Sequence, residues 1–156
     1  QLYDTLYKKE TNPFGSASRH GGYRLCPVQV MFPKEAESGE TLTLTHTWEN
    51  LGWGYCPNNI RQWNFKYKPS FALIDGNGKV VKTFVDLKAE PSDWRQSKPV
   101  SYTMKVALGD VPSGTYTWAV SIADTRKNDV PGLNMAVDAA ALTADGWLKV
   151  GKITVK

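Results

Sequence analysis

The stretch TLTLTHTWEN, at positions 41–50, alternates between apolar and polar residues more strictly than any other part of the chain. A period of two is typical of a β-strand that is buried on one face. The threonines occupy the face expected to meet solvent, and His46, on the apolar face, is expected to be a hydrogen-bonded core residue rather than a catalyst. The face expected to be buried carries Leu42, Leu44, His46 and Trp48.

Further strand patterns follow at regular intervals, separated by turn residues. The sequence DGNG at 75–78 predicts a hairpin turn. Pro27 predicts an edge position or a bulge, and Gly151 predicts a kink. The expected strands span residues 23–32, 41–50, 71–75, 79–87, 100–108, 115–123 and 147–155, and the sequence allows a short one at 133–137.

These seven to eight strands, with no convincing helix, predict an all-β fold: an antiparallel immunoglobulin-like β-sandwich. The sequence PSGTY at 112–116 is typical of the tyrosine corner of such folds. Residues 1–20 show no periodicity, so we expect a linker or an extended N-terminal arm there. A single β-sandwich domain is expected over residues 21–156.

The composition limits the partners. The chain has 156 residues and a net charge of +4, with lysines and arginines scattered along it. A nucleic-acid-binding domain usually concentrates its basic residues in one stripe, so no nucleic acid is expected. No apolar run reaches the roughly 18 residues that cross a membrane, so no membrane partner is expected either. The first residues lack the apolar region of a signal peptide and read like the interior of a longer sequence. We therefore expect a piece of a larger protein.

The two cysteines, Cys26 and Cys56, fit no zinc motif. A disulfide between them suits a secreted domain, and two buried thiols suit the sequence equally. The hairpin turn at 75–78 lacks the distal glutamate of a calcium loop. No cofactor is therefore expected, although the segment 124–145 leaves room for a structural calcium ion.

Six tryptophans are unusual for a chain of this length. Trp48 and Trp118 lie on apolar strand faces, so we expect both in the core. Trp147 opens the last strand and suits either the core or its rim. Three more lie in polar segments outside the expected strands, where they either contact a ligand or pin long loops onto the sandwich: Trp53, Trp63 and Trp94.

The densest aromatic segment is NLGWGYCPNNIRQWNFKY, at positions 50–67. A pyranose ring has a C–H face that packs on aromatic rings and a rim of hydroxyls that hydrogen-bond to amide and guanidinium groups. We therefore expect a polysaccharide or oligosaccharide as the ligand. The residues expected to stack are Trp53, Tyr55, Trp63 and Trp94, and those expected to bond hydroxyls are Asn58, Asn59, Arg61 and Gln62.

Catalysis is not expected. Glycoside hydrolysis usually needs two carboxylates that face each other across the scissile bond. Most carboxylates here fall in turns or on exposed strand faces. Glu49 adjoins the aromatic segment, and Glu90 and Asp93 flank Trp94, so these are the acids to examine.

The runs GGYRL, SGETLTLTHTWENLGWGYC, FALIDGNGKVV, VPSGTYTWAVSIAD and DGWLKVGKITV, in this order, resemble the family catalogued as domain of unknown function 4832. The resemblance covers residues 21–155. The family's WxNxG motif falls on Trp48, Asn50 and Gly52. Near Gly54 the chain departs from the family, which has an alanine there, and the insertion CPNNIRQWNFKYKP is longer than the family norm.

This resemblance implies a C-terminal β-sandwich module attached to a (β/α)-barrel glycoside hydrolase or a similar secreted bacterial protein. The expected function is a non-catalytic carbohydrate-binding module that targets a polysaccharide-degrading enzyme to its glycan, with the parent's catalytic domain as a partner. The main alternative is a structural accessory domain that packs against the catalytic barrel and has no ligand of its own. An adhesion domain and a free-standing hydrolase that uses Glu49 are further alternatives.

Overall fold

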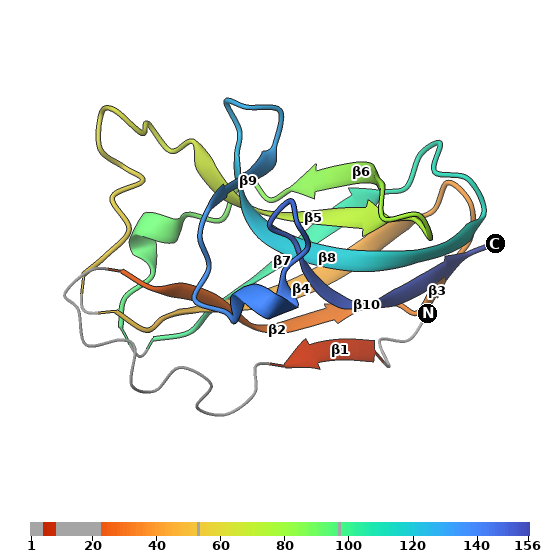
Figure 1. The fold of residues 1–156 in the computed structure, drawn as a ribbon, viewed down its shortest axis with the longest axis horizontal. Helices are drawn as coiled ribbons and strands as arrows, with labels where there is room; N and C mark the ends of the chain where they lie inside the picture. Colours follow the sequence, from red (N-terminus) through yellow and green to blue (C-terminus); the bar gives the residue numbers. More distant parts are fainter. Residues whose placement is uncertain (1–4, 9–22, 53, 97) are drawn as a thin grey trace.

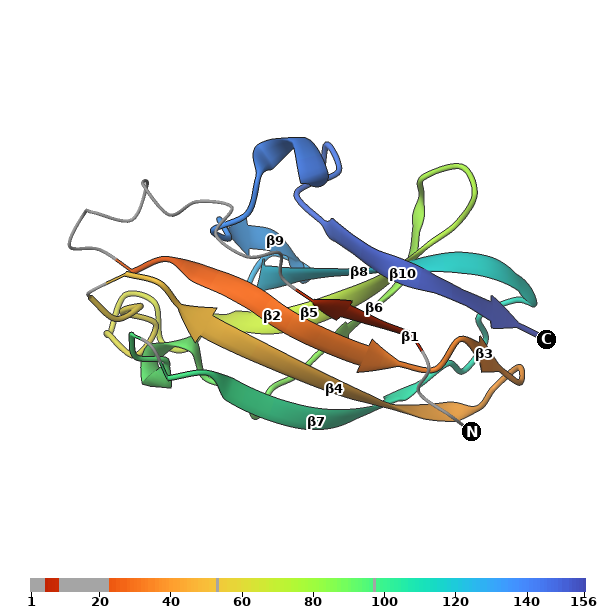
Figure 2. The same ribbon diagram turned by 90° about the horizontal axis from the view of Figure 1, so that it is seen from below.

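The computed structural model describes residues 5–8, 23–52, 54–96 and 98–156. In these residues the chain forms ten strands and two short 3₁₀ helices. The strands make two sheets that pack face to face, as Figures 1 and 2 show from two directions. The predicted fold class, an immunoglobulin-like β-sandwich, is confirmed. No helix in the described part of the chain is long and apolar enough to cross a membrane.

The first sheet has four strands in the order β1-β2-β4-β7, and every neighbouring pair is antiparallel. In β4 the even-numbered residues are all buried, which confirms the expected alternation. The strands span Thr5–Lys8 (β1), Leu25–Phe32 (β2), Thr41–Asn50 (β4) and Val100–Ala107 (β7).

The second sheet follows the order β3-β10-β8-β5-β6, and β9 pairs with the end of β8. All pairs are antiparallel except β3 with β10, which is parallel. The strands span Glu35–Ala36 (β3), Tyr67–Ile74 (β5), Val80–Val85 (β6), Gly114–Asp124 (β8), Val130–Leu133 (β9) and Leu148–Val155 (β10).

The structure has more strands than the sequence predicts because it contains two short strands that were not expected, β1 and β3. Residues Thr5–Lys8, in the expected arm, pair with β2; the other residues of that arm lie outside the described part. The short strand expected at 133–137 lies earlier, at Val130–Leu133, where it pairs with β8. Strand β5 begins at Tyr67 rather than at residue 71, since it pairs with β8 along its whole length. These strands are extended because they pair with a neighbouring strand, and the local sequence pattern does not reveal that pairing.

The predicted local features are present. The register shifts between Pro27 and Gln29 and again between Lys149 and Gly151, which confirms the bulge and the kink. The hydroxyl of Tyr116 donates to the carbonyl of Pro112 at 2.7 Å, which is the expected tyrosine corner.

The main core fills the space between the sheets and contains Trp48 and Trp118, which are 0% and 1% exposed as expected. Trp147 is buried in a different place. It packs with Ala72 and Ala119 in a second, smaller cluster. Ala119 alternates with core residues along β8, so this cluster lies on the sheet face that points away from the core. Residues before Trp147, which include the short helix η2 (Ala139–Ala141), pack instead against the main core through Val137 and Leu142.

Two loops meet at one end of the sandwich in both views (Figures 1 and 2). One is the loop between β4 and β5, residues 51–66, which we call the aromatic loop. The other carries the helix η1 (Pro91–Asp93) between β6 and β7. The β5–β6 hairpin turn and the C-terminal end of β10 lie at the opposite end. The predicted ligand residues therefore come from two loops at a single end.

Candidate functional site

The aromatic loop is anchored where it leaves β4, by the buried side chain of Asn50. Its Oδ1 accepts hydrogen bonds from the backbone N–H groups of Arg24 (3.0 Å) and Gly52 (2.9 Å). Its Nδ2 donates to the carbonyls of Gly54 (2.8 Å) and Trp94 (3.0 Å). One amide thus ties the loop to two other segments and uses nearly all of its hydrogen-bonding capacity. The WxNxG motif therefore has a structural role here.

A second anchor lies in the middle of the loop, at Asn58, which is fully buried. Its Oδ1 accepts from the N–H of Tyr67 at 3.0 Å, and its Nδ2 donates to the carbonyl of Tyr67 at 2.8 Å and to Glu90 at 2.9 Å. The expectation that Asn58 bonds ligand hydroxyls is wrong, because its amide is enclosed and fully occupied by the protein.

The chain after Asn58 makes a tight turn that directs Phe65 outward. Asn64 and Phe65 have positive φ angles of 45° and 61°. Bulky side chains rarely adopt this conformation, which costs on the order of 1–3 kcal/mol. The N–H of Phe65 donates to the carbonyl of Asn58 at 2.7 Å and holds the turn closed. As a result the Phe65 side chain is 47% exposed on an ordered backbone.

Glu90 joins the two loops from η1. It accepts hydrogen bonds from Lys68 Nζ at 3.0 Å and from the N–H and hydroxyl of Ser92 at 3.0 and 2.7 Å, in addition to the bond from Asn58. Burial raises the pKa of this carboxyl group, but the hydrogen bonds outweigh burial and lower it overall. Glu90 is therefore ionised and committed to holding the loops together.

Trp94 is a core residue, so its predicted stacking role at the surface is wrong. It is 0% exposed, and its ring stacks on Trp48 with a centroid distance of 5.1 Å. Its indole N–H donates to the hydroxyl of Tyr102 at 2.7 Å. The polar sequence around Trp94 suggests a surface, but η1 turns the ring inward and Tyr102 satisfies its only polar atom.

His46 is a hydrogen-bonded core residue, as expected. It is 0% exposed, and its Nδ1 accepts a hydrogen bond from the indole N–H of Trp48 at 2.7 Å. Its Nε2 lies 2.9 Å from a carboxylate oxygen of Asp86. Because Nδ1 accepts, the proton of the neutral ring is on Nε2 and is donated to Asp86. Both ring nitrogens are thus engaged inside the core.

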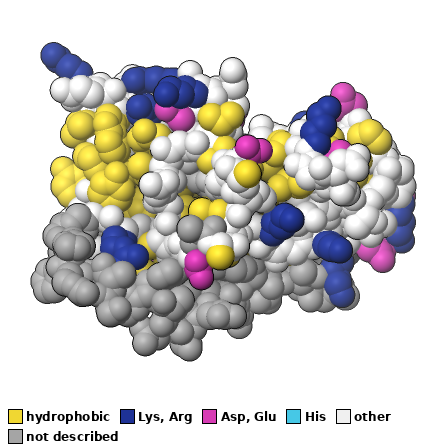
Figure 3. All heavy atoms as spheres, in the orientation of Figure 1, with side chains coloured by type: hydrophobic (Ala, Val, Ile, Leu, Met, Phe, Trp, Pro, Cys, Tyr) yellow, Lys and Arg dark blue, Asp and Glu magenta, His cyan; other side chains and the backbone are white. Residues whose placement is uncertain are grey.

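The surface of this end is formed by side chains that the two anchors leave pointing outward, and we call them the rim. Tyr55 is 45% exposed and Trp63 is partly buried. Figure 3 shows hydrophobic side chains gathered at this end, with lysine or arginine side chains beside them. The rim consists of Tyr55, Asn59, Ile60, Arg61, Gln62, Trp63, Phe65, Arg95 and Arg126.

Trp63 has a defined orientation on the rim. Its ring meets Tyr67 edge to face, with centroids 5.1 Å apart and planes at 83°. The ammonium of Lys66 lies 4.8 Å from the centroid of Tyr67 and 6.0 Å from that of Trp63. These contacts fix the indole while leaving part of it in solvent.

Two arginines from other segments complete the rim. The guanidinium of Arg95 lies 4.5 Å above the ring of Tyr55, and its Nη1 donates to the carbonyl of Ser92 at 2.9 Å. The Nη1 of Arg126 donates to the carbonyl of Gln62 at 3.1 Å. Neither arginine could be predicted to lie on the rim, because nothing in the local sequence shows that residues 95 and 126 meet the aromatic loop. Phe65 could have been predicted, since it lies in the same polar aromatic segment as Trp63.

Of the predicted rim residues, Tyr55, Asn59, Arg61, Gln62 and Trp63 lie together at the surface. Trp53 lies outside the described residues. The side chains in reach of solvent combine aromatic faces with amide and guanidinium donors, so the rim can pack against an apolar face and hydrogen-bond to oxygens around it.

The two cysteines are separate buried thiols rather than the halves of a disulfide. Burial, the largest effect, raises the pKa of the Cys56 thiol to about 12. The sequence is compatible with either a disulfide or two buried thiols, and the structure contains two buried thiols. Cys56 contributes to the packing beneath the aromatic loop.

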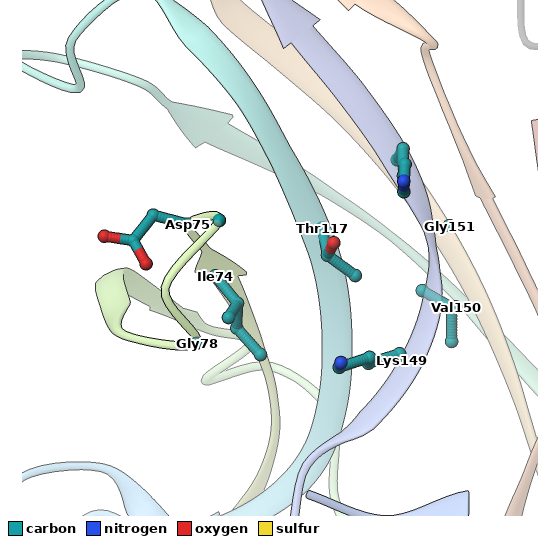
Figure 4. Close-up of a pocket in the computed structure, with 9 residues that line it drawn as sticks. Ile74, Asp75, Gly78, Thr117, Lys149, Val150 and Gly151 are labelled. Atoms are coloured by element: carbon teal, nitrogen blue, oxygen red, sulfur yellow. The ribbon is translucent and has the colours of Figure 1, made fainter.

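One of the shallow depressions elsewhere on the surface lies at the opposite end of the sandwich and has a volume of about 520 Å³. Figure 4 shows it between the β5–β6 turn and β10, with Lys149 lying across it and the carboxylate of Asp75 pointing away. Asp75 is already bonded to the N–H groups of Asn77 and Lys79, each at 2.9 Å. Among the described residues no group of three or more histidine, cysteine or acidic side chains is placed to hold a metal ion.

Comparison with known proteins yields a likeness of fold. No protein-family model matches the sequence. No curated protein matches it either. The C-terminal domain of Wzt is 12% identical, with 86% of this chain and 70% of that one covered and a TM-score of 0.48. The CARDB domain of a Pyrococcus furiosus protein, solved in complex with di-metal ions, is 11% identical over 87% of this chain and 96% of its own, with a TM-score of 0.45.

A β-glucosidase from Listeria innocua, solved in complex with glucose, contains a similar region. It is 12% identical, the match covers 85% of this chain and 16% of the enzyme, and the TM-score is 0.43. At these identities the likeness concerns the fold alone. The resemblance to the domain of unknown function 4832 family stays a prediction.

Proposed function

We propose that the chain is a non-catalytic carbohydrate-binding module of a secreted polysaccharide-degrading enzyme, and that the rim contacts the glycan. The observation that carries this proposal is the rim itself. Its aromatic and polar side chains reach solvent together, on a loop that the hydrogen bonds of the buried Asn50 and Asn58 hold in place. The aromatic members are Tyr55, Trp63 and Phe65, and the polar members named by the sequence are Asn59, Arg61 and Gln62.

The chemistry of a sugar suits such a surface. The C–H face of a pyranose packs on an aromatic ring, and its hydroxyls bond to amide and guanidinium groups at the ring edge. The anchors Asn50 and Asn58 support the proposal further, because a loop that is ordered before binding loses little conformational freedom when the ligand arrives.

The expected affinity is modest, with a Kd on the order of micromolar to millimolar, since the contacts are few and remain partly in solvent. Binding of this strength still holds an attached catalytic domain near its substrate by raising its effective concentration. Secretion, a parent enzyme and membership of the 4832 family belong to the same proposal.

Native affinity electrophoresis against a panel of plant, algal and microbial polysaccharides tests the proposal. Retardation by one glycan, lost in Trp63→Ala and in Phe65→Ala, is the expected result. Val81→Ala is the matched control, since Val81 is an exposed apolar residue on β6, outside the two loops. Retardation by no glycan in the panel, or equal retardation of all variants, would contradict the proposal.

A second function is favoured by one observation: the rim also exposes Ile60, at 38%, and Phe65, at 47%. Exposed apolar side chains on one loop suit an interface with another protein domain. In this alternative the chain packs against the catalytic barrel of its parent and has no glycan ligand. Sedimentation of the isolated domain separates the two. An interdomain face predicts self-association that Phe65→Ser removes, whereas a binding module predicts a single monomeric species.

A further inference from the structure

At the loop end three guanidinium groups are exposed, whereas two carboxylates that contact the same loops, those of Glu90 and Asp124, are turned inward. Arg61, Arg95 and Arg126 are all exposed on the rim. Two of them are held in place by the protein: Arg126 by its hydrogen bond to the carbonyl of Gln62, and Arg95 by Ser92 and the ring of Tyr55. Each thus presents its remaining N–H groups from a fixed position.

The carboxylates that contact the same loops are turned inward. The side chain of Glu90 is 15% exposed and lies 3.0 Å from Lys68 Nζ. The side chain of Asp124 is 5% exposed, lies 3.8 Å from Lys66 Nζ and accepts a hydrogen bond from the N–H of Arg126. The exposed carboxylate of η1 is Asp93. The rim therefore carries more positive than negative charge at its surface.

This arrangement bears on the class of glycan. A guanidinium group presents paired N–H donors that match a carboxylate or a sulfate group, and such charge-assisted hydrogen bonds are stronger than those to neutral hydroxyls. A neutral glycan would leave these arginines without a counter-charge. The aromatic rings beside them still suit the C–H face of a sugar.

We propose that the ligand is an acidic polysaccharide, whose carboxylate or sulfate groups pair with Arg61 and Arg126 while its sugar rings pack on the aromatic side chains of the rim. This inference rests on the proposed function and narrows it to one class of substrate. The guanidinium group of Arg95 lies on the ring of Tyr55, so these two side chains together form one part of the proposed binding surface.

Matched polymers test the inference. Polygalacturonate and its methyl ester have the same backbone and differ in charge, and dextran sulfate and dextran form a second pair that distinguishes sulfate from carboxylate. We expect isothermal titration to show binding to the charged member of at least one pair, and binding to its neutral member at least about tenfold weaker, as the loss of one charged hydrogen bond predicts. The affinity for the charged polymer should fall as salt is raised.

Variants separate local pairing from net charge. The double variant Arg61→Gln/Arg126→Gln is expected to weaken binding of the charged polymer about tenfold or more. The control Lys105→Gln/Lys149→Gln removes the same charge from exposed positions on β7 and β10 and should leave binding within about twofold.

Each remaining outcome contradicts the inference in its own way. Equal binding of charged and neutral polymers would leave a carbohydrate-binding module without a preference for acidic glycans. Equal loss in the two double variants would mean attraction by net charge alone. Binding of single-stranded DNA as tight as that of the charged polymer would mean a general polyanion surface. Binding of no polysaccharide in any panel would overturn the proposed function together with the inference.

Discussion

The indole of Trp94 stacks on that of Trp48, with centroids 5.1 Å apart and planes inclined by 18°. One residue comes from the loop with η1 and the other from near the C-terminal end of β4, so the stack joins a connecting segment to the core. The indole N–H of Trp94 is bonded to Tyr102 on β7. A segment that is polar in sequence is thus held by a buried aromatic ring.

Trp94→Ala is expected to lower the free energy of unfolding by about 3–5 kcal/mol, because it removes a large buried ring and leaves a cavity. Trp94→Phe keeps an aromatic ring and loses the hydrogen bond to Tyr102, so we expect a smaller loss. Urea unfolding followed by circular dichroism measures both. An unchanged urea midpoint for Trp94→Ala, combined with weaker glycan binding, would instead assign Trp94 to the ligand.

Asn58→Ala is expected to loosen the aromatic loop, since it removes three hydrogen bonds and leaves the backbone groups of Tyr67 without partners. The expected loss of unfolding free energy is about 2–3 kcal/mol. Trypsin should also cut faster after Arg61 and Lys66. Asn59→Ala is the matched control, because its neighbour Asn59 is exposed and should change neither property. Equal effects in the two variants would mean that Asn58 is not an anchor.

Two hydrogen-bonded carboxylates, those of the buried Asp86 and the partly buried Glu90, make the stability of the fold depend on pH. Burial alone raises the pKa of Asp86, but the hydrogen bonds from His46 and from the N–H groups of Lys88 and Ala89 outweigh it, so the pKa is lowered overall. The pKa of Glu90 is lowered in the same way. In the unfolded chain these groups titrate near about 4. Below that pH the unfolded state binds more protons than the folded state, so stability falls as the pH drops through the folded pKa values.

Urea midpoints measured between pH 6 and pH 2.5 are therefore expected to fall steadily below about pH 5. In Asp86→Asn an amide oxygen can still accept from His46 Nε2, and the titrating group is gone. We expect a lower midpoint at neutral pH and a shallower fall in acid. A slope as steep as that of the unchanged protein would show that Asp86 does not contribute to the acid dependence.

The cysteines provide a chemical check of the core. In the folded protein both thiols are expected to react slowly with a thiol reagent at pH 8, because they are buried and the pKa of Cys56 is raised to about 12. In denaturant without reductant, both cysteines of the chain should react at once. An absence of reactive thiols under those conditions would reveal a disulfide.

Much of the fold could be predicted because strands such as β4 alternate between a buried apolar face and a more exposed polar face. The alternation around His46 and Trp48, the bulge at Pro27 and the tyrosine corner at Tyr116 are all local patterns with a physical cause. The strand at Thr5–Lys8 could not be predicted in this way, since it is defined by its pairing with β2.

The site could be predicted only in part. The composition of the aromatic loop indicates that it carries unusual side chains, and Tyr55 and Trp63 do reach the surface. Whether a loop residue turns inward depends on its contacts with other segments of the chain. Asn58 is buried because it hydrogen-bonds to Tyr67 and Glu90, and Trp94 is buried because it stacks on Trp48.

The contact between Arg95 and Tyr55 has the same origin. It exists because η1 and the aromatic loop lie at the same end of the sandwich, and that arrangement follows from the strand order. The aromatic composition therefore indicates which loop exposes aromatic side chains, while the identity of the exposed residues requires the structure.

The measurement that tests the central claim most directly is a ¹⁵N–¹H NMR titration of the domain. The titrant is a set of oligosaccharides from the glycan that retards the protein in affinity electrophoresis. The account predicts shifts confined to one end of the sandwich, at Tyr55, at residues 59–65, at Arg95 and at Arg126. Shifts around the opposite depression, at residues 74–78 and 149–152, or no shifts with any oligosaccharide, would contradict it.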